Sequence, residues 1–442
     1  MRILQVTNGY PPRAFGGVET HTQRLVTALR TRGHDLRIFT RHSEGEGQDG
    51  TLVHEEVDGV GVTSIVNDAR GGRFRDHFLS APVADAFRAE ITRHRPDRVH
   101  FQHLIGLSAD LPTIAHDAGI RCVATIHEYW YACQRVMLQK ADLTACTGPA
   151  NEDCVACFLG EAASREEQAE AAARSAPSLL KRLRGRGPKP SPALVAGPPV
   201  AAERFACLQA ALRSYARITT PSQFVIDEMA RQGMPLAADR TRAIALGLPE
   251  AARPATPPRT SPISAAAPLR LVYIGHLLPH KGPHTILEAM RLVPELPLRL
   301  DLYGRRWPEN PYEKTLFPLL AAEGRAHAHG RFADGDLPDI LAAADLLVVP
   351  STCPESFGLA TREAFLAGRP VLSTDRGALP ESVGDGEDGI LVPAEDAPAM
   401  ATALRRVVEQ KALLGRLSAG AAATRIRTMD DYAAELEAFL YA

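Results

Sequence analysis

Two carboxylates stand where a strand is expected to give way to a helix. Glu355 and Glu363 are eight residues apart in the segment 354–364, which directly follows the apolar run 346–349. Open α/β sheets bind ligands at the carboxyl ends of their strands, and the free N–H groups at a helix start bind anions or hydroxyls. Carboxylates in that setting accept hydrogen bonds from sugar hydroxyls, so this segment predicts a carbohydrate site rather than two solvated surface acids.

A second segment, residues 274–283, also joins an expected strand to an expected helix. Pro283 suits the first turn of a helix, so we expect Lys281 to lie just before the helix N-terminus and to face the same point as its free N–H groups. A lysine beside a helix N-terminus is suited to a diphosphate, and His276 could add a donor or a positive charge. Only six of the 50 basic residues are lysines, which makes Lys281 conspicuous. The alternative interpretation is an ordinary turn with an exposed lysine.

Strands that alternate with helices must carry these segments. Such alternation predicts right-handed βαβ units and parallel sheets. The stretch 249–268 is rich in proline and predicts a linker. We therefore expect an α/β protein with two Rossmann-like domains facing each other across a cleft. The expected strands are residues 3–6, 36–39, 62–66, 98–101 and 122–126, and then 269–274, 298–303, 346–349 and 370–373.

The domain boundaries follow from the linker. Residues 1–250 are predicted to form an N-terminal domain with a cysteine-bearing and basic insertion at about 133–200. Residues 268–428 are predicted to form a C-terminal domain. We expect residues 429–442 to be a C-terminal helix that packs back towards the N-terminal domain.

Composition excludes several classes of protein. The 442 residues are 45% hydrophobic and carry a net charge of −2, which argues against a disordered chain and against bulk binding of nucleic acid. The N-terminus lacks the apolar core of a signal peptide, and no apolar run spans a bilayer, so we expect a cytoplasmic protein. No Gly-x-Gly-x-x-Gly follows either leading strand, which argues against a dinucleotide dehydrogenase.

Four of the seven cysteines cluster in the insertion, at Cys133, Cys146, Cys154 and Cys157. One Cys-x2-Cys pair with two outlying cysteines could complete a structural zinc site. Unbound thiols or a disulfide are the alternatives, the disulfide being less expected in an intracellular chain. Metal analysis of the pure protein distinguishes them.

The run 181–189 holds five basic residues and no acid. It could be a solvated, flexible insertion. It could instead contact an anionic membrane surface peripherally, at the inner face.

Taken in order, the motifs resemble the GT4 family of retaining glycosyltransferases, which have the GT-B fold (glycosyltransferase group 1). The resemblance covers most of both expected domains, and the two glutamates are its most specific element. The matching segments are 16–19, 32–36, 125–128, 220–222, 275–282, 355–363, 368–371, 377–381 and 388–392.

The resemblance implies that the N-terminal domain (residues 1–250) binds the acceptor and the C-terminal domain (residues 268–428) binds the nucleotide-sugar, and it implies a role for each matched residue. Glu355 would bind hydroxyls of the transferred sugar, Lys281 the donor diphosphate, and Glu363 the donor ribose. His127 would face the donor sugar, and Glu19 and Tyr129 would lie on the acceptor side. Gly16 and Gly17 would let a loop approach the diphosphate without a side-chain clash. The remaining implied donor-binding residues are His276, Phe332, Phe357, Gly358 and Leu359.

One position departs from the family. His276 stands where an arginine is usual, and a neutral imidazole supplies little charge at pH 7. The diphosphate could protonate His276, another arginine such as Arg305 or Arg306 could substitute, or stabilisation of the leaving group could be weaker.

The chemistry implied is transfer of a sugar from a UDP- or GDP-sugar to a hydroxyl of a glycan, a lipid-linked acceptor or a small molecule. No second carboxylate stands out as a nucleophile and no Asp-x-Asp element appears, so we expect front-face substitution that needs no metal cofactor. The alternatives are a nucleotide-sugar epimerase or glycosyl phosphorylase on the same fold, and a non-catalytic nucleotide-sugar binding protein.

Overall fold

The computed structural model describes residues 1–42, 48–67, 74–140, 143–149, 154–155, 157–158, 197–249, 259, 261–308 and 310–442. The chain divides into two compact units, each with its own sheet. The first unit comprises residues 1–245 and 429–442, and the second comprises residues 246–428. The basic run 181–189 lies outside the described residues, as does much of the insertion predicted at 133–200.

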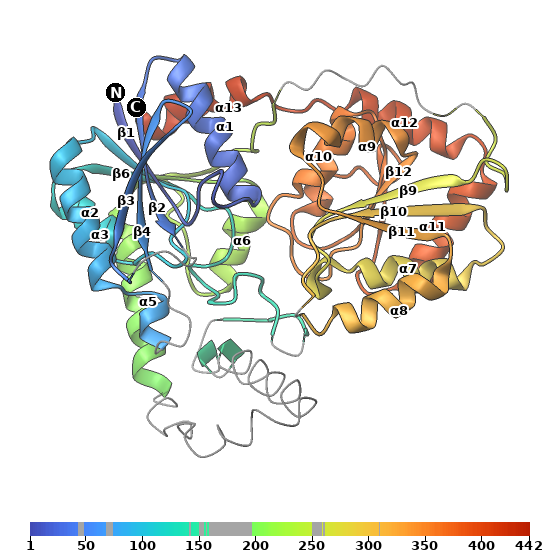
Figure 1. The fold of residues 1–442 in the computed structure, drawn as a ribbon, viewed down its shortest axis with the longest axis horizontal. Helices are drawn as coiled ribbons and strands as arrows, with labels where there is room; N and C mark the ends of the chain where they lie inside the picture. The colour runs from blue at the N-terminus through green and yellow to red at the C-terminus, as the bar shows by residue number, and fades with distance from the viewer. Residues whose placement is uncertain are drawn as a thin grey trace. The chain divides into compact units, whose positions relative to one another are not determined.

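The first unit is built on an eight-stranded sheet in the order β3-β4-β2-β1-β5-β6-β7-β8 (Figure 1). Every neighbouring pair is parallel except β3 with β4. Central strands such as β1 are apolar and buried on both faces, which is typical of parallel sheets covered by helices. The strands are β1 (Arg2–Thr7), β2 (Asp35–His42), β3 (Leu52–Val57), β4 (Val60–Val66), β5 (Arg98–Phe101), β6 (Arg121–Thr125), β7 (Tyr215–Thr220) and β8 (Thr241–Ala243).

Helices cover both faces of this sheet. In Figure 1, α2, α3 and α5 lie on one side of it, and α1 and α13 lie on the other. The chain ends in a π-helical turn, η7 (Glu437–Tyr441), that continues α13 and packs on β6 and β7. The helices are α1 (Gly17–Thr31), α2 (Ala81–His94), α3 (Leu111–Asp117), α5 (Gly197–Ser214), α6 (Gln223–Arg231) and α13 (Met429–Leu436).

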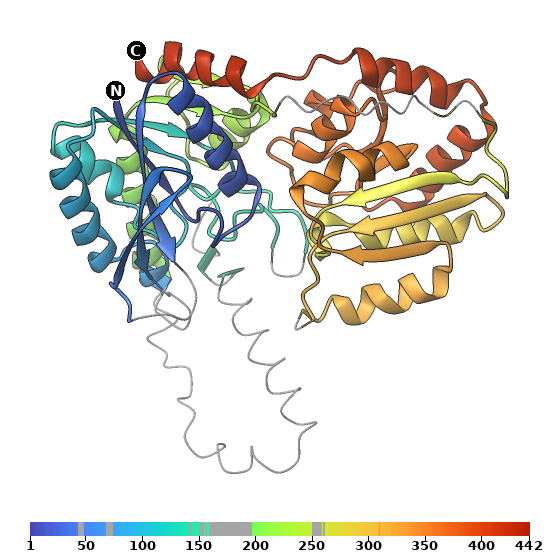
Figure 2. The ribbon, with the colours of Figure 1, turned by 45° about the horizontal axis from the view of Figure 1, so that its top comes forward.

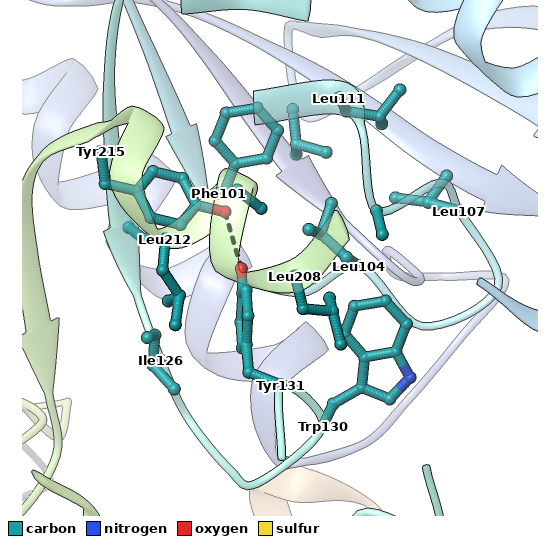
Figure 3. Packing of buried hydrophobic residues seen from close by; sticks show 14 of the residues in the cluster. Phe101, Leu104, Leu107, Leu111, Ile126, Trp130, Tyr131, Leu208, Leu212 and Tyr215 are labelled. Atoms are coloured by element: carbon teal, nitrogen blue, oxygen red, sulfur yellow. Dashed lines mark hydrogen bonds between the residues drawn. The ribbon is translucent and has the colours of Figure 1, made fainter. Parts of the chain in front are cut away.

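The core on the α3 and α5 side is mostly apolar and holds a hydrogen-bonded pair of tyrosines (Figure 3). The hydroxyls of Tyr131 and Tyr215 are 2.6 Å apart and hydrogen-bonded, and both rings are buried. Leu208 of α5 packs beside them. Because each hydroxyl partners the other, two aromatic rings are buried without an unsatisfied polar atom.

The second unit has a six-stranded, fully parallel sheet in the order β11-β10-β9-β12-β13-β14. Figure 2 shows β9, β10 and β11, in yellow to orange, side by side. The strands are β9 (Leu269–Ile274), β10 (Leu298–Tyr303), β11 (Ala326–Gly330), β12 (Leu346–Val349), β13 (Val371–Thr374) and β14 (Gly389–Val392). The helices are α7 (Pro283–Leu292), α8 (Glu313–Glu323), α9 (Leu337–Ala343), α10 (Leu359–Leu366), α11 (Ala397–Glu409) and α12 (Leu413–Ala423).

A buried carboxylate ties the end of the predicted linker into the second unit. Asp345, with a fully buried side chain, accepts hydrogen bonds from the guanidinium groups of Arg259 (2.8 Å) and Arg270 (2.7 Å). Two arginines on one carboxylate satisfy a charge that would otherwise be costly to bury. Arg259 therefore packs as part of the second unit although its sequence surroundings predict a linker.

All nine strands expected from the sequence are present in the structure. The sequence pattern missed the short or polar strands, such as β3, whose residues alternate between exposed and half-buried, and β11, which is Ala-His-Ala-His-Gly. Within the described residues, no helix combines the length and the hydropathy needed to cross a bilayer.

The core in Figure 3 gives a stability prediction. Leu208 is fully buried, so Leu208→Ala should destabilise the first unit by about 2–5 kcal/mol, through lost burial and the cavity left behind. Thermal unfolding followed by circular dichroism measures the shift. Leu52→Ala is the matched control, because Leu52 is 40% exposed on edge strand β3. Equal effects of the two substitutions would contradict this packing.

Candidate active site

The two segments singled out in the sequence meet at the topological switch point of the second sheet. After β9 the chain turns to β10 on one side, and after β12 it turns to β13 on the other. The loops that leave β9 and β12 are therefore neighbours at the carboxyl edge of the sheet, with no helix connecting across them. This is where open α/β sheets bind ligands.

Glycine lets these two loops lie against each other. Gly282 has a φ of 67°, and a Cβ atom there would lie 2.0 Å from the carbonyl oxygen of Pro350. The N–H of Thr352 donates to the carbonyl of His280 at 2.9 Å, which joins the loops a second time. Any side chain at position 282 would separate the loops, so Gly282 is needed for the geometry of the site.

Lys281 and Glu355 form an ion pair across this junction. Lys281 Nζ donates to Glu355 Oε1 at 2.7 Å, and the Ser351 hydroxyl donates to the same oxygen at 2.5 Å. Burial alone would raise the pKa of Glu355, but Lys281 and Ser351 hold it below its ordinary value. Burial would likewise lower the pKa of Lys281, and the carboxylate raises it instead. Both side chains are therefore charged at neutral pH.

The backbone of Glu355 is fixed from a third loop. Gly377 has a φ of 66°, and a Cβ atom there would lie 2.2 Å from the carbonyl oxygen of Glu355. The N–H of Ala378 donates to that carbonyl at 2.7 Å. The carboxylate is thus held by contacts to its side chain and to its main chain.

The N-terminus of α10 opens directly after Glu355. Gly358 is the N-cap residue, with a φ of 75°, and no side chain caps the helix, so the first N–H groups have no partner within the helix. Phe357 is buried and its ring stacks on the Arg362 guanidinium, 3.5 Å away, so only its backbone is placed for a ligand. Glu363 lies on the second turn of α10, half-buried.

His276 lies in an aromatic and basic setting. Its ring centroid is 6.2 Å from that of Trp307, and the Arg305 guanidinium stacks on Trp307 at 3.9 Å. Burial, Lys281 and Arg305 all lower the pKa of His276, which indicates a neutral imidazole in the unliganded protein. Arg306 points elsewhere, to Glu313 at 3.1 Å, so of the two arginines suggested by sequence Arg305 is the one placed beside His276.

Phe332 follows β11 and packs edge-on against Tyr303, with ring centroids 6.0 Å apart. Tyr303 ends β10 and stacks on His329 at 4.6 Å. Three aromatic rings therefore gather at the carboxyl ends of β10 and β11, the side of the second sheet beyond the Lys281 loop.

The first unit has its own switch point, between β1 and β5. The loop after β1 ends in Gly16, the uncapped N-cap of α1, and Gly17 is the first residue of that helix. Glu19 folds back over this helix start: it accepts from Asn8 Nδ2 at 3.1 Å, and a Cβ atom on Gly16 would lie 2.4 Å from its carboxylate. Its carboxylate thus lies at the N-terminus of α1.

His127 and Tyr129 follow β6 and have different surroundings. His127 is 5% exposed and Nε2 is 2.7 Å from Gln102 Oε1. Burial and the neighbouring histidines hold the pKa of His127 well below its ordinary value, so the ring is neutral. Tyr129, expected on the acceptor side, is 2% exposed and packs edge-on against Phe224, which favours a structural role.

The structure does not assemble the zinc site that the cysteine spacing suggested. None of the seven cysteines forms a disulfide, and in the part of the chain that the structure describes, no three His, Cys, Asp or Glu side chains form a group that could hold a metal ion. The thiol of Cys133 instead accepts hydrogen bonds from the backbone of Leu138 and Arg135, and burial raises its pKa to about 11.

Comparison with known proteins agrees with this geometry. The family model for glycosyl transferases group 1 matches residues 262–424, and that for glycosyltransferase family 4 matches residues 15–156. This chain belongs to the GT4-type glycosyltransferase family. Solved structures agree on the GT-B fold: a protein from Anabaena (HepE, in complex with UDP-glucose) has a TM-score of 0.62 at 19% identity, over 99% of each chain.

Curated relatives are also glycosyltransferases. D-inositol 3-phosphate glycosyltransferase from Nocardioides sp. is 36% identical over 34% of this chain, and the match spans 36% of that relative's length. Glycogen synthase from Mycobacterium tuberculosis is 26% identical over 98% of this chain and 91% of its own length.

Several residues of the candidate site were not singled out from the sequence. Ser351 and Gln102 carry no motif of their own, and only their contacts with Glu355 and His127 reveal them. Trp307 is one of two tryptophans, and it follows Arg305 and Arg306, which were noted; its rarity was the available signal.

The ion pair gives a pH prediction. In Lys281→Met, the largest remaining influence on Glu355 is burial, so its pKa should rise above the ordinary 4.5. A carboxyl with a raised pKa in the folded state stabilises the fold when protonated, and this contribution is lost as pH rises through that pKa. We expect Lys281→Met to cost about 1–3 kcal/mol at pH 7.5, and less as the pH falls towards 5.

The measurement is the melting temperature of wild type and variant from pH 5 to pH 8. In the double variant Lys281→Met with Glu355→Gln no carboxylate remains, while the rise in the pKa of His276 caused by the loss of Lys281 is shared by both variants, so the deficit of the double variant should shrink less on acidification. An equal pH dependence of the two deficits would contradict the assigned ion pair.

Proposed function

We propose that this glycosyltransferase moves a sugar from a nucleoside diphosphate sugar to a hydroxyl acceptor, with retention of the anomeric configuration. The observation that carries the proposal is the juxtaposition of Lys281 and Glu355, 2.7 Å apart at the switch point of the second sheet. A cation suited to a diphosphate and a carboxylate suited to sugar hydroxyls are hydrogen-bonded to each other there. A nucleoside diphosphate sugar carries both a diphosphate and sugar hydroxyls, so it matches that pair.

The diphosphate would take its charge stabilisation from two sources. One is the Lys281 ammonium, and the other is the free N–H groups at the start of α10, at Phe357, Gly358 and Leu359. Arg305 is the guanidinium that would supply the charge that His276 lacks. Stabilisation by the protein matters most for the leaving group, because negative charge builds up there as the anomeric bond breaks.

Glu355 would bind hydroxyls of the transferred sugar. Its pKa is held low, so it is an acceptor of hydrogen bonds at neutral pH, and one of its oxygens already accepts from Lys281 and Ser351. A carboxylate neutralised in this way is a poor nucleophile and a good hydroxyl ligand. Glu363, on the second turn of α10, would bind the donor ribose, and Phe332 would lie near the nucleobase.

Retention would follow from front-face substitution. The bond between the anomeric carbon and the diphosphate oxygen breaks, and a bond from that carbon to the acceptor oxygen forms on the same face. The acceptor proton passes to the departing phosphate oxygen, so no protein nucleophile is consumed. We expect no catalytic metal.

The first unit would contribute His127 to the transferred sugar, and Gly16 and Gly17 to the diphosphate. Glu19 already occupies the N-terminus of α1, so we place it beside the acceptor hydroxyl rather than on the phosphate. HepE, a solved protein of this fold, was crystallised with UDP and with UDP-glucose, which supports a UDP-sugar as the first donor to test, with a GDP-sugar as the second. The acceptor would be a glycan, a lipid-linked sugar or a small molecule with a free hydroxyl.

Donor binding provides a direct test. We expect one of the UDP-, GDP-, ADP- or dTDP-sugars to raise the melting temperature. Binding at a hundredfold excess over Kd stabilises the folded state by about 3 kcal/mol. Lys281→Ala should abolish the shift. Lys314→Ala is the matched control and should keep it, because Lys314 is an exposed lysine of α8 in the same unit.

The product then decides the reaction. With the donor so identified and a panel of hydroxyl acceptors, proton NMR should show a glycoside with the donor's anomeric configuration, formed also in the presence of a chelator. An inverted product would contradict retention. Donor binding with neither transfer nor hydrolysis would instead favour a non-catalytic binding protein.

A further inference from the structure

A buried hydrogen-bond network runs through the first unit from β7 to His127. We name it the Tyr441 network, because its middle member comes from the C-terminal turn η7 and the others come from strands of the sheet or from the residues just after those strands. Every member is at most 5% exposed. Its members are Thr219, Thr125, His100, Tyr441, Gln5, Gln102 and His127.

The placement of Tyr441 depends on the C-terminal segment. Figures 1 and 2 both show α13 (red) beside α1 (blue), and η7 continues it over the sheet. Arg98 donates to the carbonyl of Tyr441 at 3.3 Å, and the guanidinium of Arg242 lies 4.5 Å from the ring centroid of Phe439. These contacts hold the Tyr441 hydroxyl against β1 and β5, residues more than 300 positions earlier in the chain.

The donor and the acceptor of each hydrogen bond in this network can be assigned in turn, starting from a backbone carbonyl that can only accept. The Thr219 hydroxyl is 3.5 Å from the carbonyl oxygen of Ala124, which can only accept, so Thr219 donates. Thr219 Oγ1 then accepts from Thr125 at 2.9 Å, and Thr125 Oγ1 in turn accepts from His100 Nε2–H at 2.9 Å. His100 is neutral, since burial lowers its pKa to about 3. Its Nδ1 must therefore accept, and the Tyr441 hydroxyl donates to it at 2.8 Å.

The same direction continues to His127. Having donated its proton, the Tyr441 oxygen accepts from Gln5 Nε2 at 3.4 Å, and Gln5 Oε1 accepts from Gln102 Nε2 at 2.9 Å. Gln102 Oε1 is left facing His127 Nε2 at 2.7 Å and accepts from it. The proton of the neutral His127 ring is therefore on Nε2. Nδ1 keeps its lone pair, and no described group hydrogen-bonds to it.

We infer that Tyr441 is a positioning residue for sugar transfer: it orients the Tyr441 network so that His127 presents Nδ1 as a hydrogen-bond acceptor to a hydroxyl of the transferred sugar. This inference rests on the proposed function, and assigns the C-terminal turn a part in it. The reverse direction would put the proton on Nδ1 and replace that acceptor with a donor. It would also leave the carbonyl of Ala124 without the Thr219 proton.

Tyr441→Phe tests this role, because it removes one hydroxyl at nearly constant volume. With ¹⁵N-labelled histidine, NMR of the wild type should show His127 as the Nε2–H tautomer, its signals being those that disappear in His127→Gln. In Tyr441→Phe the tautomer should become mixed. We expect kcat for transfer to fall about 10- to 100-fold with the donor KM changed by less than about twofold, since nucleotide binding by the second unit is untouched.

Tyr131→Phe is the matched control. It also loses a buried phenol hydroxyl of the first unit, the one bonded to Tyr215 at 2.6 Å, but it is not a member of the Tyr441 network. We expect a comparable fall in melting temperature, with the His127 tautomer and kcat unchanged. Should Tyr441→Phe not fold, Gln102→Met removes the direct partner of His127 and should give the same two changes.

Two results would overturn the inference. One is a Tyr441→Phe protein with the wild-type tautomer, and the other is a changed tautomer with full kcat. The NMR measurement needs no substrate, so it stands even if the wild type transfers no sugar from any donor. In that event the proposed function fails, whereas the tautomer spectrum still decides whether Tyr441 orients His127.

Discussion

The site depends on the reversal of strand order in the second sheet. Because β9 and β12 are neighbours whose connections leave in opposite directions, their loops share one crevice at the carboxyl edge. The loops come close enough for a 2.7 Å ion pair only because Gly282 has no side chain to strike Pro350. The Lys281–Glu355 pair, the fixed backbone of Glu355 and the open start of α10 all follow from that junction.

Charge balance explains why this junction is stable without a ligand. A buried lysine or glutamate alone would be driven towards its neutral form. Here each holds the other ionised, so the ammonium that we propose for the diphosphate and the carboxylate that we propose for the sugar hydroxyls are both charged before any donor binds. Such preorganisation lowers the cost of reorganising the site during catalysis. The first unit is preorganised in a different way. Its neutral imidazoles and amides form hydrogen bonds that fix which atoms donate and which accept, without ionised groups.

The parts of the candidate site that lie within one short segment of the chain could be predicted from the sequence. Glu355, Glu363 and Lys281 could be predicted because each lies in a strand–loop–helix segment that has a local signature. Ser351 and Gly377 could not, because their roles depend on the approach of loops far apart in the chain. The Tyr441 network is more remote still: Tyr441 meets His100 and Gln5 only after the C-terminal segment returns to the first unit. Short apolar runs gave the central strands, whereas β11, with two histidines in five residues, has no pattern that distinguishes it from a loop.

We propose that a nucleoside diphosphate binds at the switch point between β9 and β12. A crystal structure of the protein with UDP, or with whichever nucleoside diphosphate raises the melting temperature most, tests it directly. We expect the β-phosphate to lie within hydrogen-bond distance of Lys281 Nζ and of the backbone N–H groups of Gly358 and Leu359. A nucleotide bound elsewhere, with the Lys281–Glu355 pair unchanged and without contact to α10, would contradict it.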